Sequence, residues 1–412
     1  MAQLNGNGNG RPNGRHYPHE NGLFGLVWYP STFDNMPDFV TLACTLDPGA
    51  VVQTYSSFAL LQDQHVSHPD LQLVKHIRSG RQGTVFEHIS KPYVIKKENP
   101  TWVEKGTEFT IRREYFDNLV PAAAAFTRFR KVVKTMIRVP TPLGFVSDTD
   151  TQFWDDVLPK LPLEHRTRGN VILMEHILPL AKVTRKALFS FVYGRRNLTS
   201  GQVNDLVNDP NNKQCLIHPY LGMDDNDVVD IPEFHLSFEW LRKVGMEMLQ
   251  LSVYLGRAYA ILHWGAGIDG RGVKLVLGTR CVEGEDNIRG FQNRSTELYF
   301  IDFGECTQVN LAEDEYLGVY DVYIKAMLSE TNALIIPPIS RRPGYFGGFR
   351  DAYCETSQFI LQRKDLQDKF NGYDFMNRYR NAYPDSDQLH LPGNAFRSLL
   401  ASAVEEPRLP ID

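Results

Sequence analysis

The stretch LYFIDFGEC, residues 298–306, is the most informative part of this sequence. The apolar run 297–301 is typical of a short buried strand, and it ends at Asp302. The tripeptide Asp302-Phe303-Gly304 therefore follows a strand directly, a position from which its carboxylate can coordinate a metal ion. Because such a tripeptide is common by chance, its meaning depends on what precedes it along the chain.

Two features upstream of it lie on predicted strands. The segment SGRQGTV, residues 79–85, is a glycine turn whose bare backbone amides can approach phosphate oxygens; an ordinary hairpin is the alternative. On the next strand Lys96 lies two residues after Val94, so the two side chains share a face. Glu114, on a predicted helix downstream, is a natural ionic partner for Lys96, although a lysine on an exposed edge strand would give the same pattern.

A third feature is the end of a long predicted helix, residues 238–262, which runs into LHWGAGID, residues 262–269. Glycine turn, strand lysine, helical carboxylate, histidine turn and Asp-Phe-Gly occur in this order in protein kinases. Here, however, Gly265 stands two residues after His263, where kinases place the catalytic aspartate, and Gly270 stands where we expect the metal-binding asparagine. His263 is equally well explained as a packed structural residue.

The order of elements predicts an α+β fold of the protein-kinase-like, two-lobed kind, with a small strand-rich N-lobe, a larger helical C-lobe and a ligand site in the cleft between them. Alternating hydrophobicity predicts the N-lobe strands 71–77, 84–89, 93–97 and 171–175. Residues 107–138 have a helical pattern that we expect Pro121 to interrupt. The helix 238–262 carries one apolar face, made of Leu241, Val244, Met248, Leu251, Leu255, Ala258 and Leu262.

We divide the chain into four parts. Residues 1–22 are rich in Asn and Gly and have too little to bury, so we expect a disordered tail. Residues 23–70 are an N-terminal extension that we expect to pack on the first lobe. The N-lobe then occupies residues 71–175, and the helical C-lobe residues 176–412.

Composition narrows the class of protein. The 412 residues are 42% hydrophobic and 23% charged, which is ordinary for a soluble globular chain with enough material for two lobes. The five cysteines include no C-x-x-C pair, so neither a zinc site nor a disulfide framework is expected. We find no signal peptide and no apolar stretch of membrane-spanning length, and therefore expect a cytoplasmic protein without a membrane partner.

Basic residues are concentrated in two segments despite the net charge of -5. If they form one surface, it would attract a polyanion; the alternative is a set of solvated helix faces that never meet. The candidates for contact with such a polyanion are Arg128, Arg130, Lys131, Lys134, Arg138, Lys182, Arg185 and Lys186.

The segment AYAILHWGAGIDGRGVKLVLG, residues 258–278, together with LYFIDFGEC, closely resembles the hallmark of a family of fungal kinase-like proteins, and the resemblance covers roughly residues 70–330. The family includes arginine-containing cyclodipeptide synthases of secondary metabolism. These take aminoacyl groups from charged tRNAs and join arginine to a second amino acid as a diketopiperazine. The resemblance, rather than composition or spacing, implies this activity here, with arginyl-tRNA and a second aminoacyl-tRNA as partners.

Aminoacyl transfer suits a kinase-like site that lacks its base. The tRNA ester is already activated, so the protein must mainly hold two aminoacyl ends in register, and a guanidinium needs an acidic partner. The candidates are Asp302, Asp269 and His263 for catalysis, and Glu305, Glu175, Lys96 and Glu114 for substrate binding. Cys306 is the one thiol placed to form an acyl intermediate, although a buried structural cysteine is the simpler interpretation.

Two other functions stay open. A small-molecule or protein phosphotransferase could use Asp269 as a displaced base, and would then bind ATP with Mg²⁺. A non-catalytic pseudokinase could bind a nucleotide or a partner protein. For the synthase we expect no cofactor and no metal. The second amino acid and the oligomeric state are not encoded in any pattern that we find.

Overall fold

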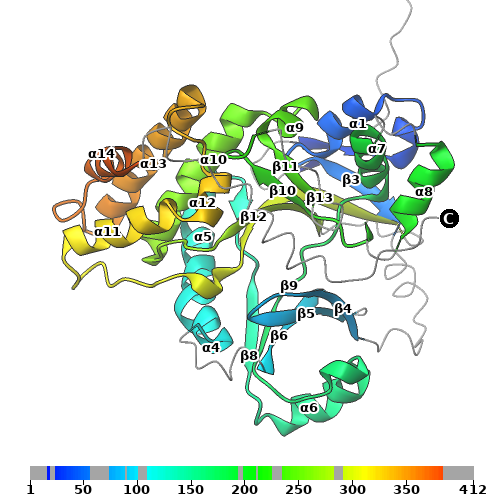
Figure 1. Cartoon of the computed structure of the whole chain (residues 1–412), viewed down its shortest axis with the longest axis horizontal. Helices are drawn as coiled ribbons and strands as arrows, with labels where there is room; N and C mark the ends of the chain where they lie inside the picture. Colours follow the sequence, from blue (N-terminus) through cyan, green and yellow to red (C-terminus); the bar gives the residue numbers. More distant parts are fainter. Residues whose placement is uncertain are drawn as a thin grey trace, which may run out of the picture.

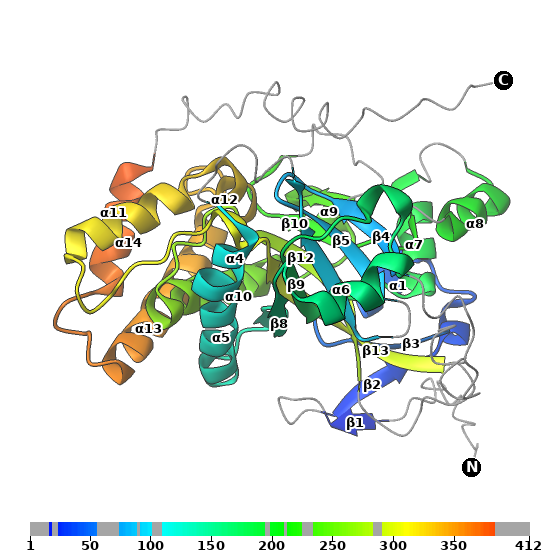
Figure 2. The same cartoon turned by 90° about the horizontal axis from the view of Figure 1, so that it is seen from below.

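A computed structural model describes residues 16–18, 24–55, 74–88, 91–100, 109–193, 198–209, 212–224, 234–282 and 291–383. They form a mixed α+β structure with two sheets and a group of helices beside the larger sheet (Figures 1 and 2). Most of the predicted tail 1–22, residues 23 and 56–70 of the predicted extension, and the first three residues of the predicted N-lobe lie outside the described residues; the described part of the tail, His16–Pro18, is a short strand.

The smaller sheet is antiparallel and has the order β4-β5-β6-β9-β8. Its strands are β4 (Val74–Ser79), β5 (Gly83–His88), β6 (Tyr93–Glu98), β8 (Pro142–Val146) and β9 (Val171–Glu175). The four strands predicted from alternation are confirmed. Phe86, Ile95 and Val171 pack on Trp154 of α6 (Thr151–Val157), which closes a small separate core. Short 3₁₀ turns, Leu158–Lys160 and Leu163–His165, follow α6.

The larger sheet joins segments that are far apart in the sequence, in the order β1-β2-β3-β13-β12-β10-β11 with β7 beside β13. These strands are β1 (His16–Pro18), β2 (Phe24–Trp28), β3 (Val51–Tyr55), β7 (Ile137–Arg138), β10 (Ile217–Tyr220), β11 (Phe234–Ser237), β12 (Lys274–Cys281) and β13 (Phe291–Ile301).

One expectation about this region was wrong. In its described residues 24–55 the extension joins the larger sheet instead of the smaller one: its strand β3 pairs antiparallel with β13, and Leu42 and Leu46 enter the main core. The part beyond residue 176 contains strands as well as helices, because β10 to β13 form the middle and one edge of the larger sheet. Buried β-branched residues such as Val51 and Val52 favour this pairing, which no local pattern reveals.

The predicted helix 238–262 is two helices with its expected face buried. α9 (Phe238–Lys243) and α10 (Met248–Ala260) are separated at Gly245, whose φ of 83° is incompatible with a continuing helix. A π-helical turn, Ile261–Ala266, ends α10. The remaining helices of this group are α11 (Tyr316–Met327), α12 (Glu330–Ile335), α13 (Pro343–Arg363) and α14 (Gly372–Ala382).

Pro121 does not interrupt its helix, contrary to our expectation. α4 (Ile111–Arg113), a π-helical turn (Glu114–Leu119) and α5 (Val120–Val133) form one continuous helical segment. The widened π turn lies directly before the proline, which has no N–H to contribute to the helix, and so the missing bond is absorbed there. Arg138 lies beyond this segment, on β7.

The remaining helices flank the larger sheet. They are a 3₁₀ turn (Pro30–Phe33), α1 (Asp38–Thr45), α7 (Lys182–Tyr193) and α8 (Ser200–Asn208). The α1 and α7 helices lie side by side, and the Ser190 hydroxyl donates to Asp38 Oδ2 at 2.5 Å. Among the described helices, none combines the length and the apolar character that crossing a bilayer requires.

Candidate functional site

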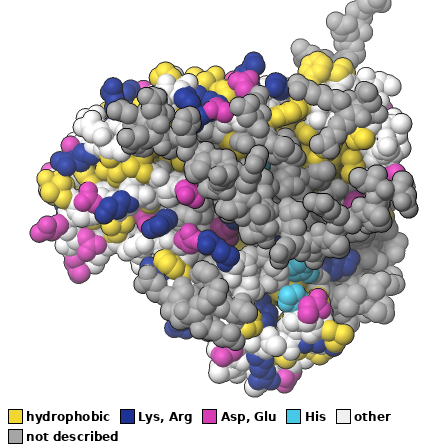
Figure 3. All heavy atoms as spheres, viewed as in Figure 1, with side chains coloured by type: hydrophobic (Ala, Val, Ile, Leu, Met, Phe, Trp, Pro, Cys, Tyr) yellow, Lys and Arg dark blue, Asp and Glu magenta, His cyan; other side chains and the backbone are white. Residues whose placement is uncertain are grey.

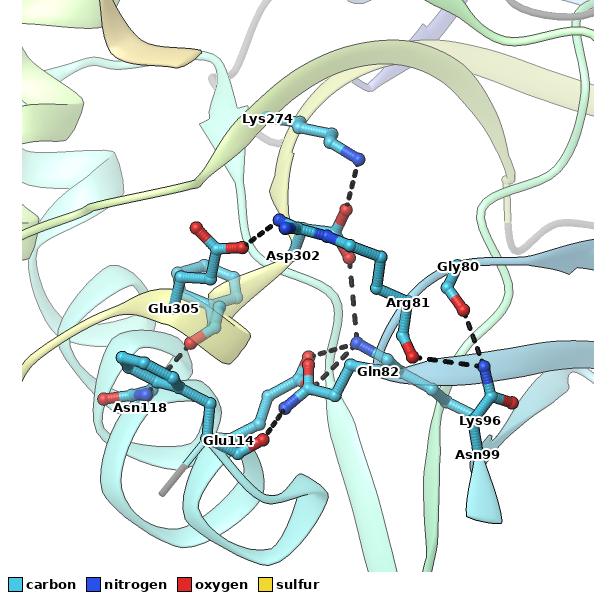
Figure 4. A network of polar contacts seen from close by, with 12 residues as sticks. Gly80, Arg81, Gln82, Lys96, Asn99, Glu114, Asn118, Lys274, Asp302 and Glu305 are labelled. Carbon is cyan, nitrogen blue, oxygen red and sulfur yellow. Dashed lines mark hydrogen bonds and ion pairs between the residues drawn. The ribbon is translucent and has the colours of Figure 1, made fainter. Parts of the chain in front are cut away.

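Asp302 lies where the two sheets meet, and two lysines approach its two carboxylate oxygens (Figure 4). Lys274 Nζ, from the first residue of β12, is 2.7 Å from Oδ2. Lys96 Nζ, from β6 of the smaller sheet, is 3.7 Å from Oδ1. Lys96 also donates to both oxygens of Glu114, each at 2.7 Å. The structure therefore brings together Lys96, Glu114 and Asp302, as the sequence predicted, and adds Lys274.

Lys96, Glu114 and Asp302 come from three separate elements. The alternation of β6 directs the Lys96 side chain toward the helical segment that carries Glu114, and both side chains are almost completely buried. Asp302 directly follows β13 and adopts the left-handed conformation, with φ 65° and ψ 63°, which is unusual for a residue other than glycine. Such a conformation persists only where surrounding contacts hold it, and such residues gather at functional sites.

The charges of the cluster are mutually stabilising. Loss of water around the Asp302 carboxyl raises its pKa, but Lys274 and Lys96 outweigh that effect and hold the pKa well below its usual range. Burial by itself would lower the pKa of Lys96, but the negative charges of Glu114 and Asp302 outweigh this effect, so that its pKa is raised. Asp302 is therefore a carboxylate at neutral pH and a poor proton acceptor.

The glycine turn between β4 and β5 closes onto the Asp302-Phe303-Gly304 turn. The Gln82 side chain lies so close to Gly304 that a Cβ there would overlap it, and its Nε2 donates to Phe109 O at 2.9 Å. Asn99 holds the turn from behind, since its Nδ2 donates to Gly80 O at 2.6 Å. At the tip, the Arg81 guanidinium pairs with the Glu305 carboxylate at 2.5 Å.

Side-chain hydrogen bonds from the helical segment 111–133 hold the backbone that follows Asp302. Asn118 Nδ2 donates to Phe303 O at 2.9 Å and to Cys306 O at 3.2 Å. Cys306 is itself fully buried, its thiol donates to Arg271 O at 3.3 Å, and burial raises its pKa well above the usual value. A thiol in this state is not a nucleophile, so the structural interpretation of Cys306 is the one that fits.

Asp269, a predicted catalytic residue, is a buried brace. Its Oδ1 accepts from the backbone N–H groups of Thr307, at 2.8 Å, and Arg271, at 3.0 Å. Burial raises its pKa, although these two donors act in the opposite direction. With 3% of its surface exposed, Asp269 cannot contact a substrate in this conformation.

His263, also a predicted catalytic residue, is fully buried. Its ring stacks on Tyr323 with 4.1 Å between centroids. Nδ1 lies 2.8 Å from the Tyr353 hydroxyl and Nε2 lies 3.3 Å from Asp269 O, so both nitrogens are engaged. Burial lowers its pKa to about 3, which keeps the ring neutral at physiological pH.

Searches for relatives give no match to any protein-family model and no match to a curated protein.

Of the two remaining acidic candidates, Glu305 is the more accessible. Its side chain is 43% exposed beside Asp302, with the Arg81 guanidinium as its ionic partner. Glu175, at the end of β9, is bound on several sides: Thr141 donates to Oε2 from its N–H and its hydroxyl, and the Tyr299 hydroxyl donates to Oε1 at 3.1 Å. The Arg280 Nε atom is 3.4 Å from the same Oε1. Glu175 thus ties the smaller sheet to the larger one.

The predicted RNA-binding residues do not form one surface. Arg130 and Arg185 are buried, and Arg185 donates to the backbone oxygens of Leu180, Val207 and Asn212. Arg138 is engaged with Glu297 at 2.9 Å. The exposed candidates fall into two groups, Arg128, Lys131 and Lys134 at the end of α5, and Lys182 and Lys186 on α7. Both views of the fold place α5 and α7 well apart (Figures 1 and 2).

Basic and acidic side chains alternate over the coloured part of the surface in Figure 3, without a single basic field. Across the residues that the structure describes, no group of three or more His, Cys, Asp or Glu side chains is arranged to hold a metal ion. Two cavities lie away from Asp302. One, of about 540 Å³, is lined by residues 308–312 with Lys364; the other, of about 380 Å³, lies between α1 and residues 244–254.

Lys274 is the residue that sequence reasoning missed. It lies five positions after Asp269 and begins the strand that precedes β13. In protein kinases the catalytic aspartate and the metal-binding asparagine are also five positions apart. Aligning the chain on Asp269 instead of His263 would have singled out Lys274 from the sequence.

Proposed function

We propose that this chain has a protein-kinase-like, two-lobed architecture and uses it to make an arginine-containing cyclic dipeptide from aminoacyl-tRNAs. In this proposal the five-stranded sheet with α6 is the N-lobe, and the eight-stranded sheet with its helices is the C-lobe. The Lys96–Glu114 pair and its approach to Asp302 support the architecture, because kinases join the same three elements in this way.

The observation that carries the choice of reaction is the state of the carboxylates. Asp302 faces an ammonium group at each oxygen and has a depressed pKa, and Asp269 is buried and bound to backbone donors. Phosphoryl transfer to a hydroxyl gains typically 10²–10⁴-fold from a positioned base, and neither residue is in a state to provide one. Aminoacyl transfer requires less help, since an amine is a good nucleophile and the ester is activated.

The reaction consists of two aminolysis steps. The α-amine of one aminoacyl group attacks the ester carbonyl of the other; a C–N bond forms, the C–O bond to the terminal ribose breaks, and the proton of the amine passes to the departing ribose oxygen. Repetition within the dipeptidyl ester closes the ring. Two esters are thereby exchanged for two amides and two uncharged tRNAs leave, so the protein contributes chiefly by positioning, worth up to about 7–11 kcal/mol.

Glu305 is the best candidate for the substrate guanidinium. It is a carboxylate beside Asp302 that already binds a guanidinium, that of Arg81, and both partners are accessible to solvent. A salt bridge this exposed contributes little stability, so a substrate arginine can exchange with Arg81 at low cost. Glu175 is less suited because its oxygens hold the two sheets together.

The decisive experiment uses arginyl-tRNA and a pool of other aminoacyl-tRNAs that are charged beforehand and freed of ATP and synthetases. The purified chain should release a cyclic arginyl dipeptide, detected by mass spectrometry, and ribonuclease pretreatment should prevent it. A protein that instead phosphorylates an acceptor when given ATP would be a phosphotransferase. Absence of both products would indicate a non-catalytic binding protein.

For tRNA binding we favour the exposed stripe on α5, whose members Arg128, Lys131 and Lys134 recur every three residues. Replacing all three with Ala should weaken tRNA binding. It should also reduce the slope of log K against log salt concentration by up to about three, because each lost phosphate contact lowers that slope by about one. The matched control is the Lys182→Ala, Lys186→Ala double variant on α7. An equal loss in both variants, or in neither, would refute the assignment to α5.

A further inference from the structure

The surroundings of Asp302 do not fit the metal that a kinase-like fold implies. In kinases this aspartate binds Mg²⁺ together with an asparagine five residues after the catalytic aspartate. Counted from Asp269 rather than from Gly265, the corresponding position is Lys274, whose ammonium group lies 2.7 Å from Asp302 Oδ2. We infer that Lys274 is a built-in cation that takes the place of a metal ion on Asp302, so that this site excludes Mg²⁺.

The chemistry of the donors supports this inference. Mg²⁺ requires an almost ideal octahedron of oxygen ligands at 2.0–2.1 Å. An ammonium group offers no lone pair, so Lys274 removes one ligand that the asparagine would supply. It also places a positive charge against the oxygen that the metal would use, and Lys96 places a second one 3.7 Å from the other oxygen. A divalent cation would meet two like charges at short range.

Burial does not explain the exclusion. The side chains of Asp302 and Lys274 are 41% and 33% exposed, so water and ions can reach them. The obstacle to a metal is therefore the charge and the missing ligand, and both are properties of one residue. Changing Lys274 to Asn should remove both at once.

Lys274 is thus a positioning residue, which fixes the carboxylate of Asp302 without a metal. Since its ammonium is held by Asp302, it stabilises the left-handed conformation at the end of β13 in the way that a bound ion otherwise would. This role does not depend on the substrate. If the proposed aminoacyl transfer were disproved, the role of Lys274 would be unaffected. If the role of Lys274 were disproved, the proposed aminoacyl transfer would be unaffected.

The test measures binding of Mn²⁺, as a probe for Mg²⁺, to the full chain without tRNA or nucleotide, from the free Mn²⁺ signal in electron paramagnetic resonance. Wild type should show no Mn²⁺ site that depends on Asp302. The Lys274→Asn variant should bind Mn²⁺ more than about tenfold tighter than wild type, because a like charge close to the metal is removed. The Lys274→Asn, Asp302→Asn double variant should lose the gain.

Lys325→Asn, at an exposed lysine on α11, is the matched control and should behave like wild type. Mn²⁺ binding by wild type that Asp302→Asn abolishes would overturn the inference, and this arm requires no change at Lys274. It would equally be overturned if Lys274→Asn folded with the circular dichroism and melting behaviour of wild type but gained no Mn²⁺ site. If Lys274→Asn does not fold, Lys274→Gln supplies the same amide ligand on a longer side chain and is judged by the same outcomes.

Discussion

The turn at residues 267–272 (the Asp269 turn) and the turn at residues 302–306 (the Asp302 turn) lie beside each other. Each carries an aspartate, but the two carboxylates are held by different kinds of partner. Asp269 is buried and accepts from the neutral backbone N–H groups of Arg271 and Thr307. Asp302 is partly exposed and faces the ammonium groups of Lys96 and Lys274. The first arrangement fixes the backbone of the turn, whereas the second keeps a negatively charged carboxylate where a ligand can reach it. Only the second is suited to chemistry.

The largest effect on stability should come from the charges that support Asp302. Lys96→Met leaves Glu114 buried without its counter-ion, which typically costs about 3–5 kcal/mol. Lys97→Met is the matched control, because the neighbouring Lys97 donates to the neutral Thr167 hydroxyl rather than to a carboxylate. Urea unfolding of both variants measures the difference. Equal losses would mean that the Lys96–Glu114 pair contributes nothing as a pair of charges.

The Asp269 turn should respond to shape rather than to charge. Asp269→Ala leaves the N–H groups of Arg271 and Thr307 without their acceptor, at a cost of about 1–3 kcal/mol for each stranded donor. Asp269→Asn keeps an acceptor oxygen and should recover most of the stability, since burial already disfavours the charged form. If Asp269→Asn lowers the free energy of unfolding as much as Asp269→Ala does, in thermal or urea unfolding, the negative charge of Asp269 stabilises the turn. The proposed difference between the two turns would then be wrong.

Acid should weaken the Asp269 turn before it affects Asp302. His263 has a folded pKa of about 3, below its unfolded value near 6.5, so the unfolded state binds the proton first. Stability is therefore lost as pH falls below 6.5, by about 1.4 kcal/mol per pH unit for this residue. His176, with a pKa of about 4, adds a similar loss. Asp302, whose folded pKa is depressed, contributes stability that is lost only as pH falls below about 4.

His263→Phe separates these contributions because it keeps the stacking on Tyr323 but cannot titrate. Between pH 6 and pH 5, the slope of the unfolding free energy against pH should be smaller than in wild type by about 1.4 kcal/mol per pH unit, which corresponds to one proton fewer taken up on unfolding. An unchanged slope would show that His263 is not held neutral in the folded protein.

Local patterns predicted much of this structure. Alternation identified four strands of the smaller sheet, and helical periodicity identified the buried face of residues 238–262, because both depend on neighbouring residues alone. The pairing of β3 with β13 joins segments more than two hundred positions apart, and periodicity carries no information about such partners. Arg130 and Arg185 were placed on the surface because charged residues usually lie there, whereas the fold buries both.

The candidate site was predicted in part for the same reason. Lys96, Glu114 and Asp302 occupy positions fixed by their own strands and helix, and the structure brings them together. The sequence could not show that Asp269 and His263 are buried and hydrogen-bonded, and burial and hydrogen bonding, rather than residue type, decide whether a side chain can react. Lys274 was missed because the chain was aligned on His263; its spacing of five residues from Asp269 identifies the position, whereas its ion pair with Asp302 is seen only in the fold.

The most direct test of the account compares Asp302→Asn with Asp269→Asn in the reaction with pre-charged arginyl-tRNA. Each variant loses one negative charge and keeps the shape of the side chain. Asp302→Asn should lower the rate of cyclic dipeptide formation by about 10²-fold or more, because the position of the turn is lost, while Asp269→Asn should stay within about tenfold of wild type. The opposite order would show that the Asp269 turn is the reactive one and would contradict the account.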